Sequence, residues 1–276
     1  MRSGNSVAGF CLFWLLPDIP AIFRRLSTRP LLSSGLGTMA AAVMAVLWVD
    51  RPLAIYFKYQ ADPALVAAFE SVTEIGRGDW YFAIAGVALV IGLLFARRGI
   101  DRKAQVYGLY VAAKASYMLS ALAAAGLTVI TVKLVLGRVR PRYLFESDLY
   151  GLIPGNFDFG MNSFPSGHSQ VIWTVVTALC LMAPPWRKIL IPIAVVVSLS
   201  RVVVTAHYAS DVIVGAYVGI ATAILLRHHV FPDLPCTAKR DLAPQSGIKR
   251  RWRRVLIRSH RRPTGGMAPA VTKASA

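Results

Sequence analysis

Residues 106–132 read VYGLYVAAKASYMLSALAAAGLTVITV, an apolar stretch with Lys114 as its single charged side chain. A helix of about 20 such residues crosses the hydrocarbon core of a bilayer, so this stretch is long enough to span a membrane. Further apolar runs lie at 33–50, 79–96, 168–184, 188–206 and 211–227. The sequence therefore predicts an all-α protein built as a bundle of six transmembrane helices.

The composition agrees with a membrane protein. Hydrophobic residues make up 55% of the 276 residues and charged residues only 16%, and the mean hydropathy is +0.53. An ordinary soluble domain of this length is less apolar. The formal net charge of +18 does not indicate nucleic-acid binding, because the basic residues are confined to the segments between apolar runs instead of forming one solvated face.

The distribution of Lys and Arg predicts the orientation, since cytoplasmic loops carry an excess of these residues. With the N-terminus inside, the inner segments hold most of the cations, whereas the first outer loop is net acidic: it carries Arg51, Lys58 and Arg77 against Asp50, Asp62, Glu70, Glu74 and Asp79. Both termini are expected in the cytoplasm. Lys114 then lies near the inner interface, where a lysine can snorkel toward water.

Three segments are expected along the chain: a cytoplasmic or interfacial stretch at 1–32, the six-span domain at 33–230, and a basic tail at 231–276, expected to be disordered. The apolar stretch from Val7 to Leu16 is too short for a seventh span. The tail either touches anionic lipid or only anchors the topology, and both readings are open. Cys11, Cys180 and Cys236 are too far apart in sequence to indicate a disulfide framework or a zinc site.

Polar residues gather at three places that this topology puts on the outer face. The first is the end of the third span, with Lys133, Arg138, Arg140, Pro141 and Arg142. The second is the start of the fourth span, Phe164-Pro165-Ser166-Gly167-His168-Ser169. The third joins the fifth and sixth spans and holds Ser200, Arg201, His207 and Asp211. We expect the three places to form one site.

The residue types in these clusters favour an anion. Lys133, Arg140 and Arg201 would repel one another in a pocket at membrane depth unless an anion lay between them. Phosphate suits them, because Arg offers a planar fork to its oxygens and Lys a compact charge. Ser166 and Gly167 begin a helix, whose free N–H groups favour an anion, and glycine lets that anion approach the backbone.

The two outer histidines are expected to divide the chemistry. His207 and Asp211 are four residues apart, which puts them on one face of a helix, and a carboxylate bonded to one ring nitrogen leaves the other as a nucleophile. His168 is expected to donate a proton to the departing lipid oxygen. With three fixed cations to stabilise the transition state, no metal or other cofactor is expected.

At these residues the sequence resembles the type 2 phosphatidic acid phosphatases, or lipid phosphate phosphatases, which share their signature with vanadium-dependent haloperoxidases and glucose-6-phosphatase. The signature is a Lys six residues before Arg-Pro, then Pro-Ser-Gly-His, then Ser-Arg with five residues before His and three more before Asp. It is met at Lys133 to Pro141, at 165–168, and at Ser200 to Asp211.

The resemblance implies a helical bundle of the lipid phosphate phosphatase type and a phosphohistidine route. It implies His207 as nucleophile, His168 as acid, Asp211 as the supporting carboxylate, and phosphate contacts from Lys133, Arg140, Ser166, Gly167 and Arg201. The substrates of bacterial relatives include undecaprenyl pyrophosphate, phosphatidylglycerophosphate, phosphatidic acid and lipid A, among which nothing here chooses. The expected location is the bacterial inner membrane, with the site facing the periplasm.

Two other functions would also explain part of this pattern. An anion transporter or a catalytically silent scaffold would explain helices and an anion site but would not require both histidines and Asp211. A vanadium haloperoxidase could use the same pocket, although those relatives are typically soluble. Arg138 and Arg142 either touch phosphate or are solvated, and Gly215 and Gly219 pack either within the bundle or in a dimer, so the oligomeric state is open. The loop after the first motif, including Tyr143, Phe145, Glu146, Asp148, Tyr150, Phe157 and Phe159, is the expected source of headgroup selectivity.

Overall fold

The structure is a computed structural model that describes residues 28–234. The expectations for Val7 to Leu16, Cys11, Cys236 and nearly all of the basic tail therefore lie outside the described residues.

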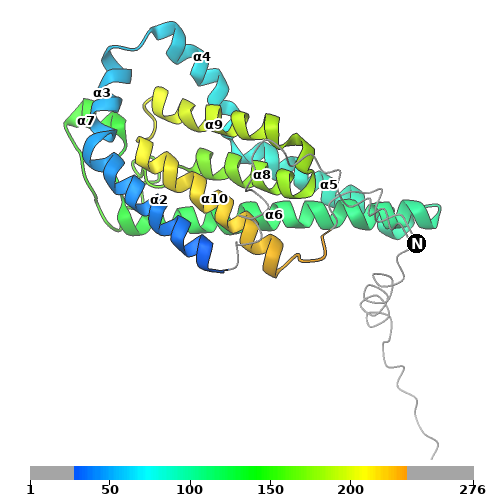
Figure 1. Cartoon of the computed structure of the whole chain (residues 1–276). Helices are drawn as coiled ribbons and strands as arrows, with labels where there is room; N and C mark the ends of the chain where they lie inside the picture. The colour runs from blue at the N-terminus through cyan, green and yellow to red at the C-terminus, as the bar shows by residue number, and fades with distance from the viewer. Residues whose placement is uncertain (1–27, 235–276) are drawn as a thin grey trace, which may run out of the picture. The chain divides into compact units, whose positions relative to one another are not determined.

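The described residues are mainly helical and contain no named strand, which confirms the all-α prediction. In chain order the elements are α2 (Thr28–Trp48), α3 (Asp50–Tyr59), α4 (Pro63–Thr73), the 3-10 turn η1 (Glu74–Gly76), α5 (Gly78–Arg98), α6 (Arg102–Leu136), α7 (Pro141–Ser147), α8 (Gly167–Met182), η2 (Pro184–Trp186), α9 (Arg187–Val203) and α10 (Ala209–His229). Figure 1 shows α2, α5, α6, α8, α9 and α10 as the long helices.

Each of the six predicted runs coincides with one of these long helices. Four helical segments are long and apolar enough to cross a membrane by length and composition, Leu31–Trp48, Pro63–Arg98, Arg102–Leu136 and Ala209–His229. The helices α8 and α9 are shorter, with 16 and 17 residues. The protein is thus a multi-pass membrane protein, and the count of six spans stays a prediction.

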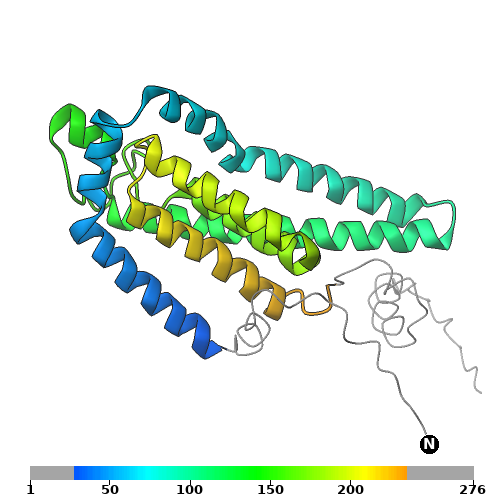
Figure 2. The same cartoon turned by 45° about the horizontal axis from the view of Figure 1, so that its top comes forward.

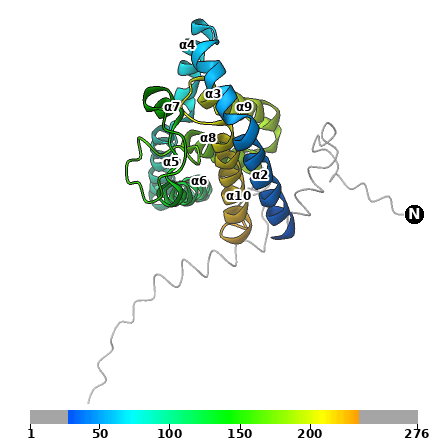
Figure 3. The ribbon, with the colours of Figure 1, turned by 90° about the vertical axis from the view of Figure 1, so that its left-hand side faces the viewer.

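The helix α8 occupies the centre of the bundle and packs against α6, α9 and α10 (Figure 3). On one side Val175 and Ala178 join Tyr117 and Leu122 of α6 in a buried cluster. On another side Ile172 and Val176 of α8 pack against α9. Because α8 carries the Pro-Ser-Gly-His motif at its start, this central position fixes the second motif in the bundle.

Glycine makes the contact between α8 and α10 close. A Cβ added to Gly215 would lie 2.4 Å from the Ser166 carbonyl oxygen, and one added to Gly219 would lie 2.4 Å from the Gln170 carbonyl oxygen. Both contacts are to backbone within the same chain, so these two glycines serve packing inside the bundle and are not free to form a dimer face.

The helices α5 and α6 form a long hairpin that Figure 2 shows reaching past the ends of α8 and α10. Its backbones approach closely where Gly92 and Gly108 meet, since a Cβ on Gly108 would lie 2.6 Å from the Gly92 carbonyl oxygen. The 35 residues of α6 extend well beyond the predicted run, over about 52 Å. Lys114 lies in this helix with its Nζ 4.3 Å from the Tyr110 ring centroid, a cation–π contact.

Candidate active site

The three polar clusters meet at one end of the bundle. The end of α6, the start of α8, and the segment that joins α9 to α10 all lie there, beside α3 and α7 (Figure 1). Hydrogen bonds join the motifs directly: the Ser166 amide donates to the Asp211 carbonyl at 3.0 Å, and the Ser163 amide donates to the Arg138 carbonyl at 2.6 Å. The three motifs lie far apart in the sequence, and the fold brings them together at one place, as expected.

Lys133 and Arg140 point toward the same backbone carbonyl. Lys133 Nζ donates to the Asn162 carbonyl at 2.8 Å and to the Ser163 carbonyl at 3.1 Å, while Arg140 Nε donates to the Asn162 carbonyl at 3.3 Å. The turn between them requires Gly137, whose φ is +55°. A Cβ added to this residue would lie 1.7 Å from the Ile153 carbonyl oxygen. This glycine ends α6 and turns the chain so that both cations reach one place.

Arg201 is the third cation, buried at the end of α9. Its Nη1 donates to Thr73 Oγ1 at 2.5 Å, and its Nε is buried without a hydrogen-bond partner among the described residues. Lys133, Arg140 and Arg201 are close enough to repel one another electrostatically. The Ser166 hydroxyl is likewise buried without a partner in the described part of the chain. Unpaired buried donors beside three cations fit an anionic ligand.

His207 lies in the segment between α9 and α10 and is 3% exposed. Its Nδ1 is 3.6 Å from Asp211 Oδ2, longer than a hydrogen bond, and 3.2 Å from Ser163 Oγ. Ser163 Oγ is also 2.5 Å from Asp211 Oδ2. A carboxylate can only accept, so the single Ser163 proton points to Asp211, and the Ser163 oxygen accepts the Nδ1 proton of His207. The lone pair of His207 is then on Nε2, the nitrogen needed for attack.

Burial also keeps His207 neutral. Desolvation lowers the pKa of His207 from its ordinary value to about 3, and the nearby Lys133 and Arg140 act in the same direction, against the opposing effect of Asp211. Above that pH the ring is uncharged, so Nε2 offers its lone pair without first losing a proton.

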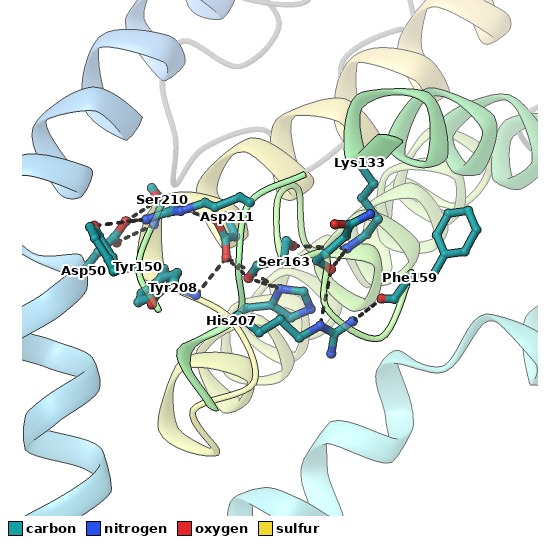
Figure 4. A network of polar contacts seen from close by, with 12 residues as sticks. Asp50, Lys133, Tyr150, Phe159, Ser163, His207, Tyr208, Ser210 and Asp211 are labelled. Atoms are coloured by element: carbon teal, nitrogen blue, oxygen red, sulfur yellow. Dashed lines mark hydrogen bonds and ion pairs between the residues drawn. The ribbon is translucent and has the colours of Figure 1, made fainter. Parts of the chain in front are cut away.

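Asp211 is held by more partners than the sequence suggested, as Figure 4 shows. Besides Ser163, it accepts the Tyr208 amide at 2.9 Å on Oδ2 and Arg138 Nη1 at 2.7 Å on Oδ1. Its place in the first turn of α10 explains the amide contact, because helix N-termini leave such N–H groups free for a nearby carboxylate. Arg138 reaches on to Asp50 Oδ2 with Nη2 at 2.8 Å.

His168 and Gly167 form the first turn of α8, and both are partly exposed. Gly76 of η1 packs against the imidazole, since a Cβ there would lie 3.1 Å from His168 Cδ2. Arg201 and Arg140 place two positive charges near His168, and Glu74 places one negative charge there. A Cβ on Gly167 would meet no atom within 4 Å, so nothing in the protein itself demands glycine at this position.

Residues 114–234 match the family model described as the PAP2 superfamily. This stretch holds all three motifs, so the chain is similar to the PAP2 superfamily throughout its site. A solved structure with the same fold is the transmembrane PAP2-type phosphatidylglycerolphosphate phosphatase of Bacillus subtilis, with a TM-score of 0.54, 21% identity, and coverage of 74% of this chain and 96% of that one. This likeness supports the fold.

Two curated relatives of this protein have names that state an activity. The lipid A 1-phosphatase of Rhizobium etli is 28% identical over 183 residues, which are 66% of this chain and 77% of the relative. The undecaprenyl-diphosphatase of Sulfolobus acidocaldarius is 41% identical over 88 residues, covering 32% of this chain and 41% of that protein.

Two expectations about this site need correction. Arg138 neither faces solvent nor sits among the three cations: it is buried between two carboxylates, Asp50 and Asp211, which hold its pKa above the ordinary value against the effect of burial. Asp50, counted above as a charge of the outer loop, has no exposed side-chain surface. Arg142 is exposed and donates to the Gly160 carbonyl at 3.0 Å.

Four residues of the site were not predicted from the sequence: Asp50, Thr73, Ser163 and Ser210. Three of them lie outside the three clusters, and Ser210 was passed over between His207 and Asp211. A usable signal existed for Asp50, because it is the last residue of the apolar run at 33–50, where an ionisable residue is a candidate for function. Ser163 directly precedes the second motif and could have been included in it.

Proposed function

We propose that this protein is a membrane lipid phosphatase that transfers the phosphoryl group of a lipid to His207 and then to water. The observation that carries the proposal is the meeting of three cations with a neutral, buried histidine whose Nε2 is free to attack. A protein that only bound or moved an anion would need the cations but not this histidine with its fixed tautomer.

In the first step Nε2 of His207 attacks phosphorus and the bond between phosphorus and the lipid oxygen breaks. His168, which takes up a proton when the negatively charged phosphate binds beside it, gives that proton to the lipid oxygen. Lys133, Arg140 and Arg201 stabilise the charge on the equatorial oxygens, together with the Ser166 hydroxyl and the backbone N–H groups at the start of α8. The imidazolium that forms keeps its proton on Nδ1 and donates it to Ser163 Oγ, next to the negative Asp211.

In the second step a water molecule attacks the phosphohistidine. His168, now neutral, takes a proton from the water, the bond between phosphorus and Nε2 breaks, and inorganic phosphate leaves with His207 restored. Gly167 favours both steps because a side chain at this position would occupy the space next to the α8 terminus. We expect no metal requirement, because the fixed cations take the role that a metal ion has in other phosphoryl transfers.

The substrate is a phosphorylated lipid of the membrane. Because the name of the Rhizobium etli relative specifies the 1-phosphate of lipid A, lipid A is the first substrate to test, and undecaprenyl diphosphate is the second. We place the protein in the bacterial inner membrane with both termini in the cytoplasm and the site on the periplasmic side. The net acidic first outer loop and the basic inner segments support this orientation.

The test is phosphate release by the full chain purified in detergent, with EDTA present. The substrates are lipid A, undecaprenyl diphosphate, phosphatidylglycerophosphate and phosphatidic acid. The variants are His207→Ala and the control Ser198→Ala, which removes a buried hydroxyl bonded to Trp173. Release that persists in EDTA and disappears in His207→Ala alone supports the proposal. Equal release by His207→Ala would overturn it, and release from no lipid would favour a transporter or scaffold.

A further inference from the structure

We infer that Asp50, acting through Arg138, is a positioning residue for the nucleophile and that the corner between α2 and α3 is therefore part of the catalytic apparatus. This inference rests on the proposed function and extends it to a residue outside the three motifs. Asp50 begins α3, and it lies 88 positions from Arg138 and 160 positions from Ser210 in the sequence.

Asp50 is buried and fully engaged with the site end of α10 (Figure 4). Its Oδ1 accepts the Ser210 amide at 3.0 Å, and its Oδ2 accepts both the Ser210 hydroxyl and Arg138 Nη2. Arg138 Nη1 in turn donates to the Ser210 hydroxyl at 2.6 Å. These bonds fix the first turn of α10, the turn that carries Asp211.

Arg138 divides its fork between two carboxylates. Nη2 binds Asp50 Oδ2 at 2.8 Å and Nη1 binds Asp211 Oδ1 at 2.7 Å. The planar guanidinium therefore sets the position of Asp211 relative to α3. The Tyr208 ring supports the guanidinium from its face, with the Arg138 Cζ 4.3 Å from the ring centroid, and Tyr150 packs edge-on against Tyr208.

The division has an electrostatic consequence for His207. Arg138 uses only one oxygen of Asp211, so the other oxygen is left to Ser163 and, through it, to the Nδ1 proton of His207. The three buried groups carry one net negative charge, because two carboxylates share one guanidinium. Without the Asp50 charge, Arg138 would neutralise Asp211 fully, and less negative charge would remain to stabilise the imidazolium formed during phosphoryl transfer.

A purely structural role is the competing explanation, since a buried ion pair across 88 residues could simply hold α3 in place. The two roles differ in what they predict for the folded enzyme. A structural role lowers the amount or the thermal stability of the protein but leaves the turnover of each folded molecule unchanged. A positioning role lowers kcat and weakens binding of vanadate, which mimics the transition state through a bond to the nucleophile, but spares binding of sulfate, which only needs the cations.

The experiment uses Asp50→Asn in the purified full chain. Asn keeps the size of the side chain and an oxygen to accept the Ser210 amide, while removing the charge. Asp62→Asn is the matched control, because Asp62 is an exposed cap of α4 and Asn caps helices equally well. Tyr117→Phe is the structural control, because it removes the buried hydrogen bond from Tyr117 to the Ala223 carbonyl, a bond made outside the site.

Phosphate release from lipid A and the other three lipids gives kcat and KM, and vanadium NMR gives the Kd for vanadate. For Asp50→Asn we expect kcat to fall and the vanadate Kd to rise by about 10- to 100-fold, the range typical of groups that orient a histidine through its other ring nitrogen in metal sites. KM and the sulfate Kd should stay within about twofold of wild type, the precision to which independent effects add. Both controls should keep the wild-type kcat for each folded molecule.

A double-mutant cycle tests whether Asp50 acts on the nucleophile through Asp211. If Asp50 acts through Asp211, then Asp50→Asn should change the vanadate Kd by no more than about twofold in a chain that already carries Asp211→Asn. Two results would overturn the inference and leave the proposed function standing. The first is an equal effect of Asp50→Asn on the vanadate Kd in both backgrounds. The second is an active wild type with a kcat for Asp50→Asn equal to that of Asp62→Asn. Wild-type protein that neither hydrolyses any of the lipids nor binds vanadate would overturn both.

Discussion

Ser163 shows how a single hydroxyl can set the chemistry of a histidine. It donates to Asp211 and accepts from His207, so its removal leaves Nδ1 without its hydrogen-bond partner and a buried carboxylate short of one donor. We expect Ser163→Ala to lower kcat by about tenfold or more with little change in KM, because the groups that bind phosphate are elsewhere. Steady-state kinetics on the preferred lipid measures this.

The control for that prediction is Ser198→Ala. Ser198 is also buried and accepts a hydrogen bond from Trp173 Nε1 at 3.0 Å, but it does not contact His207. Both variants should lose about 1–3 kcal/mol of stability from an unpaired buried group. If the two variants kept equal kcat values, Ser163 would have no role in orienting the histidine.

His207 gives a prediction about pH. Its pKa of about 3 is below that of an unfolded histidine, about 6.5. Between these values the unfolded chain binds a proton that the folded chain does not, so this group makes the protein less stable as the pH falls from 6.5 toward 3, by about 1.4 kcal/mol for each pH unit.

Thermal unfolding of wild type and His207→Asn at pH 7.5 and pH 5 tests this sign. Wild type should lose more stability on acidification than the variant, which has no ring to protonate. The same low pKa implies that kcat/KM shows no acid limb near pH 6.5 from protonation of the nucleophile. Equal acid sensitivity of the two proteins would contradict the neutral, buried histidine.

The site was predictable as far as its residues lie in local motifs. Lys133, Arg140, Arg201, His168 and His207 could be named because their charge and polarity stand out in an apolar sequence. The partners behind them could not. Asp50 reads as one of several acids of an outer loop, and only the docking of α3 on α10 buries it. Arg138 differs from Arg140 in the sequence by two positions, but the turn at Gly137 decides which of them faces Asp211.

At the scale of elements, the apolar runs were sufficient to place six long helices, because membrane spans must satisfy their backbone bonds internally. The short helices α3, α4 and α7 were not foreseen. Charged residues interrupt α3 and α7, and α4 is apolar but has only 11 residues, too few to span a membrane. The extent of α6 was also underestimated, because its first turn at Arg102 and Lys103 is charged although Asp101 caps it through the Ala104 amide at 2.7 Å.

The contact between α8 and α10 gives a prediction about packing. We expect Gly215→Ala to lower activity severely and stability by about 1–3 kcal/mol, because the added methyl group would push the Ser166 backbone away from α10. Thermal unfolding and phosphate release measure the two effects. Gly126→Ala in α6 is the control, since a Cβ there meets no atom within 4 Å, and it should behave as wild type. Normal activity in Gly215→Ala would show that this close approach is not needed.

For the whole molecule, the charge distribution predicts on which side of the membrane each loop lies. Ile100 is fully exposed at the turn between α5 and α6, and Ser147 is exposed at the end of α7. In a chain whose native cysteines are replaced by serine, we expect a maleimide that cannot cross membranes to label Ser147→Cys in spheroplasts and to label Ile100→Cys only after lysis. The reverse pattern would invert the topology and put the site in the cytoplasm.

The bond from Asp50 through Arg138 to Asp211 also matters for the way the protein is made. The ribosome releases α2 and α3 first among the described helices and α10 last, and the nucleophile and its supports come from both ends of this order. Every helix between them can already be inserted while the site still lacks His207 and Asp211. A complete active site therefore forms only when α10 docks against the corner between α2 and α3, and a chain that ends before α10 does not yet contain Asp211.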